Sequence, residues 1–486
     1  MPTAKSFTAR TMSTKVALSL CFFCGFAEGL CMTNGRFRNP ILNNNLICGE
    51  GAAPAESGKR AMKPECDFTS QLFSERIPLS PIWDGKVFPL VHESIKAASA
   101  PGGHHGADKR FQLAVDRLIR GDQLVIGVLG GSMTHGHGAH APWPKVLEHF
   151  LQSLGYNVTV LNLAHPATTS KWATRNIQDL RQKGLDNSHL VLVDYAVNDN
   201  EKAVGKRRNN DVRESFTDLM ALLIDLENRP AVIAVETFNN LYSQLPECSN
   251  FSARAYYNHW DVLEKLAIPT VCFMSAICSS KSASPREWWF GGMHTGDPFQ
   301  LVHPGDATHD LVARTVLGAF LNKMESVCAH GGPKGLDYPK LAPRSEALQC
   351  LSKPTAYHHA MYGKEAFAPA SNTTWKFEED VPGKPGWIAT GLADIEFAIT
   401  THSGWLQFEF LGTYKDIGSA TVWVDTSEPG KWDTVSMPKP LCQIDGLWDD
   451  HTSQSRFSLM RVAPGDHVVH LRSKGPKFKL LGLVAC

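Results

Sequence analysis

The chain has 486 residues, and its 48 lysine and arginine side chains balance 48 aspartate and glutamate side chains, so the formal net charge at pH 7 is zero. This balance gives no reason to expect a nucleic acid or an anionic membrane surface as a partner. The length allows two to three domains, and the composition changes after Val327.

The first residues are typical of a secretory leader. Lys5, Arg10 and Lys15 precede the apolar run 16–27, which is short for a membrane span. We therefore expect residues 1–29 to be a signal peptide, or alternatively an uncleaved signal anchor that holds the protein in the Golgi. No later run is long and apolar enough to span a bilayer, so the rest is expected to be lumenal or extracellular.

The cysteines agree with an oxidising compartment. Of the 12 cysteines, Cys21 and Cys24 lie in the leader, and an even set of 10 remains. Several disulfides are expected, and we pair Cys442 with Cys486, which lie alone in the C-terminal part. Three sequons, at Asn157, Asn250 and Asn372, permit glycosylation.

From Gln123 onward, short apolar runs alternate with amphipathic segments, which predicts a parallel sheet covered by helices. We expect strands near 124–129, 157–164, 189–196, 230–236 and 269–275. Helices are expected near 144–154, 170–184, 211–227, 252–266 and 307–326. The predicted unit is a three-layer α/β/α domain at 111–328, which follows a partly irregular N-terminal flank at 30–110.

A serine stands on a glycine turn at the end of the first of these strands. Gly130, Gly131 and Ser132 follow the apolar run 124–129. Open α/β sheets bind ligands at the carboxyl ends of their strands, and glycines allow a sharp turn and a close approach. Gly-Gly-Ser is also common in linkers, so the turn predicts a nucleophile only in combination with a base.

Two further polar segments follow strands of their own. Residues 162–170 come after the second predicted strand, and residues 194–199 end the third with Asn198 and Asp199. The Asn-Asp pair could be an ordinary turn. Its position after a buried strand favours a place at the same edge of the sheet as Ser132.

Asp306 and His309 stand three positions apart at the start of the last predicted helix. At this spacing both side chains can face one pocket. A serine hydroxyl is a weak nucleophile unless a histidine accepts its proton and a carboxylate orients that histidine, and this pair supplies both groups. The alternative is that Asp306 caps the helix while His309 lies on its surface.

The four elements, in the order Ser, small residue, Asn-Asp and Asp-x-x-His, resemble the SGNH (GDSL-type) hydrolase family. The resemblance implies a flavodoxin-like α/β/α fold and a carboxylic ester hydrolase that needs no cofactor. It implies that Ser132 is the nucleophile, His309 the general base and Asp306 its orienting acid. The implied oxyanion hole consists of the backbone N–H groups of Ser132 and Ala167 and the side chain of Asn198.

The resemblance covers roughly residues 111–327, and the chain departs from the family pattern at two positions. Alanine replaces the usual glycine at Ala167 in the second block and at Ala196 before the Asn-Asp pair. Neither change removes a needed atom, because the oxyanion donor at Ala167 is a main-chain N–H. A positive φ at Ala167 would cost about 1 kcal/mol.

Residues 329–370 are predicted to be a linker, because they are rich in Gly, Pro and Ala. After them, short alternating runs separated by Gly, Pro and Asp predict strands, and we expect a jelly-roll-like β-sandwich at 371–486. This domain could bind carbohydrate if Trp387, Trp432 or Trp448 is exposed and stacks on sugar rings. The alternative is that these tryptophans belong to the core.

Several histidines lie outside these blocks and could suggest a metal site. They are His104, His105, His135, His137, His140, His358 and His359. Neither a carboxylate nor a cysteine stands at ligand spacing in the run from His135 to His140, so we expect no metal there and interpret the run as lining a substrate cleft. Trp288, Trp289 and His294 lie in a long stretch with Gly and Pro, and are candidate residues of the cleft wall.

The sequence thus predicts a secreted or lumenal serine esterase that forms an acyl-enzyme on Ser132, with acetylated carbohydrate or another small ester as substrate. A Golgi-type polysaccharide O-acetyltransferase using the same residues is the first alternative, which an uncleaved N-terminal anchor would favour. An inactive glycan-binding surface protein is the second, because Ala167 and Ala196 depart from the family pattern.

Overall fold

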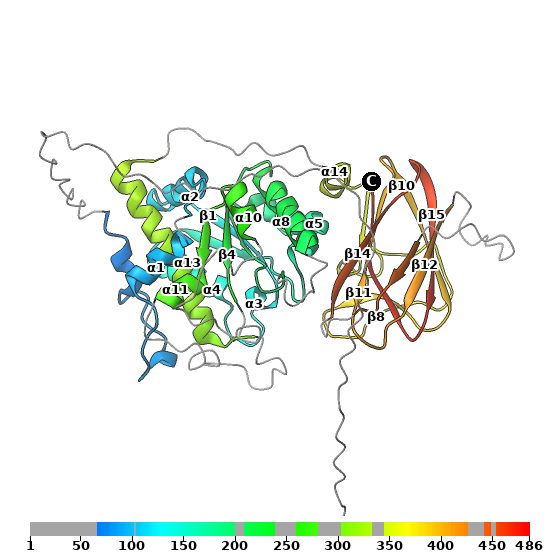
Figure 1. Cartoon of the computed structure of the whole chain (residues 1–486), viewed down its shortest axis with the longest axis horizontal. Helices are drawn as coiled ribbons and strands as arrows, with labels where there is room; N and C mark the ends of the chain where they lie inside the picture. The colour runs from blue at the N-terminus through cyan, green and yellow to red at the C-terminus, as the bar shows by residue number, and fades with distance from the viewer. Residues whose placement is uncertain are drawn as a thin grey trace, which may run out of the picture. The chain divides into compact units, whose positions relative to one another are not determined.

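The structure is a computed structural model that describes residues 66–101, 104–199, 209–238, 259–279, 303–332, 345–425, 442–448 and 453–486. The predicted leader and most of the N-terminal flank lie outside these residues. Among the helices of the described ranges, none has the length and apolar character needed to cross a bilayer. The elements form an α/β part followed by an all-β part (Figure 1).

Five strands form a parallel sheet in the order β2-β1-β3-β4-β5. Their bounds are β1 Leu124–Gly130, β2 Val158–Asn162, β3 Leu190–Asp194, β4 Ala231–Glu236 and β5 Thr270–Cys272. This is the flavodoxin-like order. The chain connections run to opposite sides of β1 and β3, which leaves a ligand site at the carboxyl ends of these two strands. The five predicted strands and their parallel sheet are confirmed.

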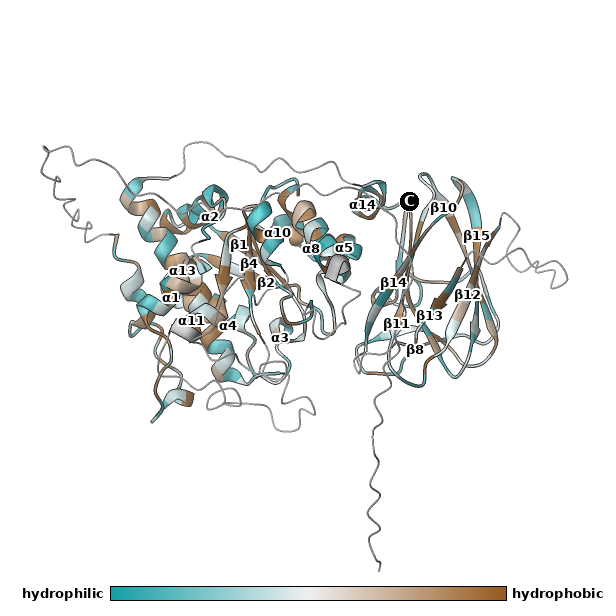
Figure 2. Ribbon diagram, in the orientation of Figure 1, coloured by the Kyte–Doolittle hydropathy of each residue, from teal (hydrophilic) through white to brown (hydrophobic). Residues whose placement is uncertain are grey.

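Helices cover both faces of this sheet. Along β3, Leu190 and Leu192 belong to one apolar core and Val191 and Val193 to the other, as the two-residue period of a strand requires. Figure 2 accordingly shows β1 and β4 largely brown. The helices of the first core are α1 His92–Ser99, α2 Lys109–Ile119, α4 Trp143–Ser153, α11 Phe273–Ser279 and α13 Asp306–His330; those of the second are α5 Ser170–Arg175, α6 Ile177–Gln182, α8 Asn209–Ile224 and α10 Trp260–Lys265.

Three local features differ from the expected elements. The helix expected at 170–184 is divided at Asn176, whose side chain donates to Trp172 O at 3.2 Å and competes with the helical backbone. The strand expected at 269–275 ends at Cys272 and continues as α11. The flank expected to be partly irregular contains α1, which packs against α11 and α13. Short elements complete this part: η2 Thr69–Phe73, η3 Pro81–Trp83, α3 Ser132–His135 and η5 Leu185–Asn187.

The all-β part consists of two antiparallel sheets around one apolar core, and the predicted β-sandwich is confirmed. One sheet has the order β13-β12-β15-β10-β7 and the other β14-β11-β16-β9-β8, with β6 also paired to β16. The bounds are β6 Ala356–His359, β7 Ser371–Asn372, β8 Lys376–Glu379, β9 Pro385–Ala389, β10 Ala393–Thr401, β11 Trp405–Gly412, β12 Ser419–Asp425, β13 Cys442–Asp445, β14 Gln454–Arg461, β15 Gly465–Lys474 and β16 Phe478–Ala485. Helix α14 Glu346–Ser352, strand β6 and turn η7 Ala360–Tyr362 lie in the segment predicted to be a linker.

The tryptophans considered for sugar binding are buried where the structure describes them. Trp387 is 1% exposed and donates its Nε1–H to Phe367 O at 2.7 Å. Trp448 is 6% exposed. The core alternative is correct for Trp387, which belongs to the apolar core of the sandwich. Trp448 lies outside that core cluster and lines a pocket, and Trp432 lies outside the described residues.

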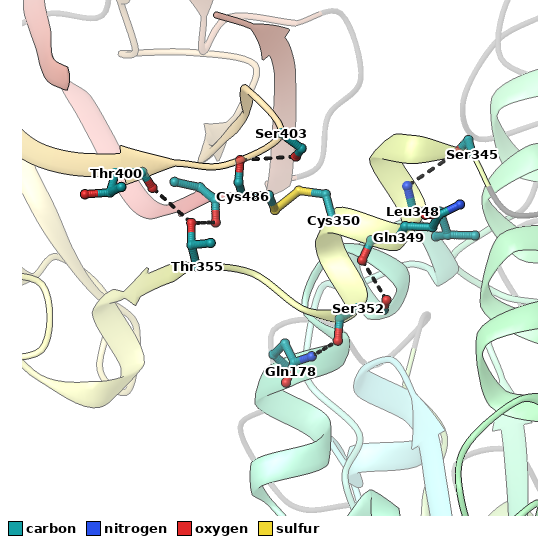
Figure 3. Close-up of a disulfide and its surroundings, with 11 residues drawn as sticks. Gln178, Ser345, Leu348, Gln349, Cys350, Ser352, Thr355, Thr400, Ser403 and Cys486 are labelled. Atoms are coloured by element: carbon teal, nitrogen blue, oxygen red, sulfur yellow. Dashed lines mark hydrogen bonds between the residues drawn. A yellow bond between two sulfur atoms is a disulfide. The ribbon is translucent and has the colours of Figure 1, made fainter. Parts of the chain in front are cut away.

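Two disulfides are present among the described residues. Cys66 is bonded to Cys328, and Cys350 on α14 is bonded to Cys486, the residue after β16 (Figure 3). The predicted pairing of Cys442 with Cys486 is therefore wrong. Cys442 lies on β13, in the sheet that does not contain β16, and it is not in a disulfide.

Candidate active site

Ser132 lies on the turn that follows β1, at the carboxyl edge of the sheet, and begins α3. The two preceding glycines are required by close packing. A Cβ on Gly131 would lie 2.6 Å from Asn198 Oδ1, and a Cβ on Gly130 would collide with Thr134 Oγ1. The same contact places the amide of Asn198 against the nucleophile turn, as its position after β3 predicted.

A buried carboxylate is hydrogen-bonded to the turn that carries Ser132. Asp194, the last residue of β3, accepts hydrogen bonds from Thr134 Oγ1 at 2.7 Å and from Thr237 Oγ1 at 2.6 Å. Burial raises the pKa of Asp194 to about 6. The hydroxyl donors fix α3 relative to the ends of β3 and β4, which positions Ser132.

The histidine that reaches Ser132 is one that no sequence motif singled out. His303 Nε2 lies 2.9 Å from Ser132 Oγ, within hydrogen-bond distance. The ring of His303 stacks on that of His137, with centroids 5.2 Å apart and planes at 29°. His137 belongs to the histidine run predicted to line a cleft, and this contact places it beside the histidine at the nucleophile.

The hydrogen bonds of His309 lie elsewhere. Its side chain is 1% exposed, and its Nδ1 accepts the backbone N–H of Trp143, on α4, at 3.1 Å. Burial lowers the pKa of His309 to about 4. The reason for this placement is that α13 is buried on nearly all sides, so a histidine one turn inside it enters the core. We therefore replace His309 by His303 as the proposed base.

Asp306 binds the histidine-rich loop. Its Oδ1 accepts the backbone N–H groups of His140 at 2.7 Å and Ala141 at 3.4 Å, and its Oδ2 lies 2.8 Å from His140 Nδ1. These contacts anchor the loop that carries His137. The hydrogen bonds of Asp306 therefore go to the loop that carries His137, whereas the Asp-x-x-His spacing predicted a direct contact with His309.

Ala167, the second expected oxyanion donor, has a φ of 61°. This is the left-handed region, which an L-residue other than glycine occupies at a cost of about 1–2 kcal/mol. The segment is held by Thr168, whose Oγ1 donates to His165 O at 2.6 Å, and by the His165 N–H, which donates to Gly130 O at 3.0 Å. The unfavourable φ considered for this alanine is thus present.

Behind Asn198 lies a buried cluster of one histidine and two carboxylates. His259 Nδ1 is 3.0 Å from Glu236 Oε1, and its Nε2 is 3.0 Å from Asp199 Oδ2. Burial by itself lowers the pKa of His259, but the two carboxylates outweigh it and raise this pKa to about 10. Asp199 Oδ1 also accepts the backbone N–H of Ser170 at 3.1 Å. The imidazolium therefore fixes the Asn-Asp turn and ties it to the start of α5.

Other histidines singled out in the sequence have structural partners. His104 Nε2 lies 2.9 Å from Ile268 O, and His358 Nδ1 lies 3.1 Å from Ala366 O. Within the described ranges, no three His, Cys, Asp or Glu side chains are arranged to hold a metal ion. The candidate cleft-wall residues at 288–294 lie outside the described residues.

A pocket of about 120 Å³ adjoins the candidate oxyanion residues. Its walls include Ser170 and Asn198 from the α/β part, and Trp448, Ser455 and Arg456 from the β-sandwich. The guanidinium of Arg456 lies 5.8 Å from the Trp448 ring centroid. Residues of the β-sandwich therefore stand next to the side chain expected to bind the oxyanion.

The fold and these strand-end residues define a two-domain architecture, an α/β domain with a serine at the end of β1 followed by a β-sandwich. A scan against protein-family models finds no match, and a search of curated proteins finds none either. Among solved structures, the chain is similar to a two-domain esterase (CEX) active on acetylated mannans, co-crystallised with mannopentaose. The identity is 18% and the TM-score 0.53, over 82% of this chain and 98% of that chain.

A second crystal structure of a two-domain esterase (CEX) active on acetylated mannans gives the same TM-score of 0.53 and 18% identity, over 79% of this chain and 96% of that chain. A catalytic mutant of an acetylxylan esterase from Geobacillus stearothermophilus matches 40% of this chain and 94% of its own chain at 13% identity. Its TM-score of 0.32 is too low to show a shared fold. The comparisons confirm the expected fold, a three-layer α/β/α domain followed by a β-sandwich.

Proposed function

We propose that this protein is a secreted serine esterase that removes ester-linked acyl groups, chiefly O-acetyl groups, from carbohydrate through an acyl-enzyme on Ser132. The observation that carries the proposal is the 2.9 Å distance between Ser132 Oγ and His303 Nε2 at the carboxyl edge of a parallel sheet. A serine activated by a histidine is the arrangement that nucleophilic ester cleavage needs.

In the first half-reaction, the Ser132 hydroxyl attacks the ester carbonyl and its proton passes to His303 Nε2. Collapse of the tetrahedral intermediate breaks the bond to the alcohol, which leaves with the proton from His303. In the second half-reaction, His303 takes a proton from water and the resulting nucleophile attacks the acyl-enzyme. The second tetrahedral intermediate then collapses, the bond between the acyl carbon and Ser132 Oγ breaks, Ser132 Oγ takes back the proton from His303, and the carboxylic acid departs. The base used here is His303, and His309 takes no part in proton transfer.

The developing oxyanion is bound by the backbone N–H groups of Ser132 and Ala167 and by the side chain of Asn198. The position of Asn198 against Gly131 supports its role, because it brings the amide next to the nucleophile. Fixed donors of this kind act where charge develops and need no reorganisation during the reaction.

Carbohydrate is the proposed substrate class for two reasons. The pocket beside Asn198 has polar walls from both parts of the chain, including Ser170, Ser455 and Arg456. The fold is that of a two-domain esterase active on acetylated mannans. Secretion is supported by the two disulfides, which persist in oxidising compartments.

The test is acetate release from an aryl acetate and from acetylated mannan and xylan, with the full secreted chain and its Ser132→Ala variant. We expect the variant to lose turnover by about 10⁴-fold or more. Thermal unfolding of both proteins confirms that they are folded. Equal release by wild type and variant would contradict the role of Ser132. If the folded wild type releases no acetate but transfers acetyl groups to a sugar, the acetyltransferase is correct instead.

A further inference from the structure

Glu409 is a buried carboxylate of the β-sandwich whose hydrogen bonds reach into the α/β domain. It lies on β11 and is 3% exposed. Its Oε1 accepts the Nε1–H of Trp172 at 3.1 Å, and its Oε2 accepts the Nδ2–H of Asn176 at 3.0 Å. A buried carboxylate is costly unless it is hydrogen-bonded, so these donors and Glu409 hold each other in place.

Neighbouring residues of the β-sandwich fix the position of the Glu409 carboxylate. Glu409, Gly482 and His359 are neighbours across β11, β16 and β6. A Cβ on Gly482 would come within 2.9 Å of His359 Cδ2, so the glycine leaves room for the other two side chains to meet. Met361 N–H donates to His359 Nδ1 at 3.2 Å, which makes His359 Nε2 the donor to Glu409 Oε2, also at 3.2 Å.

These contacts keep Glu409 ionised. Burial by itself raises the pKa of Glu409, but the charge and hydrogen bond of His359, together with the hydrogen bond from Asn176, outweigh it and hold this pKa below its ordinary value. Three donors, from Trp172, Asn176 and His359, therefore converge on one negative charge in the interior. Hydrogen bonds to an ionised acceptor are about twice as strong as those between neutral groups.

Trp172, which is hydrogen-bonded to Glu409, also contacts the segment that contains Ala167. The ring of His165 stacks on that of Trp172, with centroids 5.0 Å apart and planes at 21°. The backbone of His165 is in turn bonded to Gly130 and Thr168. A left-handed alanine persists only where its surroundings fix it, and this stack is part of what fixes Ala167.

We propose that Glu409 is a positioning residue for the esterase centre, an inference that rests on the function proposed above. It holds Trp172 and Asn176 at the two ends of one helical turn, and through them the segment 165–169, so that Ala167 N–H stays directed at the oxyanion. The β-sandwich is then part of the catalytic unit even for a substrate too small to bind to it.

The test compares Glu409→Gln with Glu396→Gln in the full chain, with 4-nitrophenyl acetate as substrate. Glutamine keeps the volume of Glu409 but offers one acceptor and one donor group where three donors converge. Glu396 is a matched control, because it is 4% exposed, lies on β10 in the other sheet and contacts His470 Nδ1 at 3.3 Å. Thermal unfolding shows that each variant is folded at the assay temperature.

We expect Glu409→Gln to lower kcat by about tenfold or more, within the roughly 10²-fold that a misplaced group costs, and to change KM by less than about twofold. Glu396→Gln should keep both parameters within about twofold of wild type. A folded Glu409→Gln protein with the wild-type kcat would overturn the inference. A merely structural role would lower the unfolding temperature without changing kcat per folded molecule.

A second measurement is independent of turnover. The stack on Trp172 gives the His165 ring protons a ring-current shift in the NMR spectrum, and Glu409→Gln should change this shift while Glu396→Gln leaves it as in wild type. If the wild type cleaves no ester, the proposed function fails. Independently of that result, unchanged His165 signals in Glu409→Gln would show that Glu409 does not position the segment 165–169. A wild-type kcat in Glu409→Gln with an active wild type would defeat this inference alone.

Discussion

The two sides of the candidate active site are held in different ways. The base side consists of Ser132, His303 and His137. They are joined by the contact of Ser132 Oγ with His303 Nε2, by the stack of the two histidine rings and by the His137 N–H, which donates to Ser132 O at 3.0 Å. Neutral hydroxyl donors to the buried Asp194 hold the turn of Ser132. The oxyanion side consists of Ala167 and Asn198, and fully buried charges stand behind it. These are His259, which contacts the carboxylates of Asp199 and Glu236, and Glu409, which accepts the Nε1–H of Trp172.

This difference follows from the chemistry proposed for each side. A general base must gain and lose a proton in every half-reaction, so its contacts have to suit two charge states. Oxyanion donors stabilise charge by being fixed before the reaction, and fixing backbone and amide dipoles requires support from outside the site. The oxyanion side is therefore expected to respond to remote substitutions more strongly than the base side.

Apart from the loss of Ser132 itself, the largest effect should come from the base. His303→Gln keeps a polar side chain near Ser132 but cannot take up a proton, and we expect kcat to fall by about 10²–10⁴-fold. The matched control is His309→Asn, which retains an acceptor for Trp143 N–H without an imidazole. Steady-state kinetics on an aryl acetate would reverse our assignment if the His309→Asn variant were folded and inactive while the His303→Gln variant kept its turnover.

The next largest effect should come from Asn198. Removing one side-chain donor from an oxyanion hole costs roughly 10²–10³-fold in kcat, and Asn198→Ala is expected to lie in this range. Asn187→Ala, at an exposed position at the end of η5, serves as the control. If kcat of Asn198→Ala stayed at the wild-type value in a folded protein, the amide would be assigned to packing against Gly131 alone.

The buried imidazolium behind Asn198 should govern stability. His259→Leu leaves Asp199 and Glu236 buried without their partner, and we expect the free energy of unfolding to fall by about 3–5 kcal/mol. Urea denaturation measures this change, with His149→Leu, an exposed position on α4, as the control.

This stabilisation should also depend on pH with a defined sign. The folded-state pKa of His259, about 10, lies above its ordinary value of 6.5. Its contribution is therefore fully present below pH 6.5 and is lost as the pH rises towards 10. The stability gap between wild type and His259→Leu should shrink across this interval. A gap that stays constant from about pH 6 to about pH 10 would mean that the histidine is not held as an imidazolium.

A smaller effect is expected at Asp306. If this carboxylate were the direct orienting acid of the base, Asp306→Asn would lower kcat by about 10⁴-fold. Because its hydrogen bonds go to His140 and Ala141, we expect a loss on the order of tenfold, through displacement of the loop that carries His137. The kcat of the purified variant distinguishes the two roles, since they differ by about three orders of magnitude.

The parts of this molecule that the sequence predicts are those with a local pattern. Buried parallel strands are short apolar runs between helices, and this pattern located β1, β3 and β4 within a residue or two at most of their ends. Ser132 and Asn198 could be placed because the carboxyl ends of neighbouring parallel strands meet at one edge of the sheet.

The base proposed from the structure differs from the His309 predicted from the sequence, because two histidines stand six positions apart near one helix start. His303 precedes Gly305, the N-cap of α13, and can face the strand ends, whereas His309 lies inside a helix buried on nearly all sides. Apolar residues fall on most sides of this helix between Leu311 and Leu321, and this is the signal that could have separated them. No local pattern could indicate the contact of His259 with Asp199, 60 positions away, or that of Glu409 with Trp172, 237 positions away.

The smallest expected effect tests the strained alanine on the oxyanion side. Ala167→Gly removes the cost of a positive φ but adds freedom to the unfolded chain, so we expect a gain of about 0.5–1 kcal/mol in stability. Ala267→Gly is the matched control, because Ala267 has a φ of 50° in the turn after α10 and should show a similar gain. Stability is read from thermal unfolding of both variants.

Combining Ala167→Gly with Glu409→Gln then separates the effect of the positive φ at Ala167 from the effect of the hydrogen bonds of Glu409. With Glu409 in place, the Trp172–His165 stack holds the segment, and glycine at 167 should leave kcat within about twofold of wild type. Without the carboxylate, glycine can leave the left-handed region freely, so the double variant should lose more activity than the two single variants predict together. Simple additivity would show that the oxyanion segment keeps its shape without help from the β-sandwich.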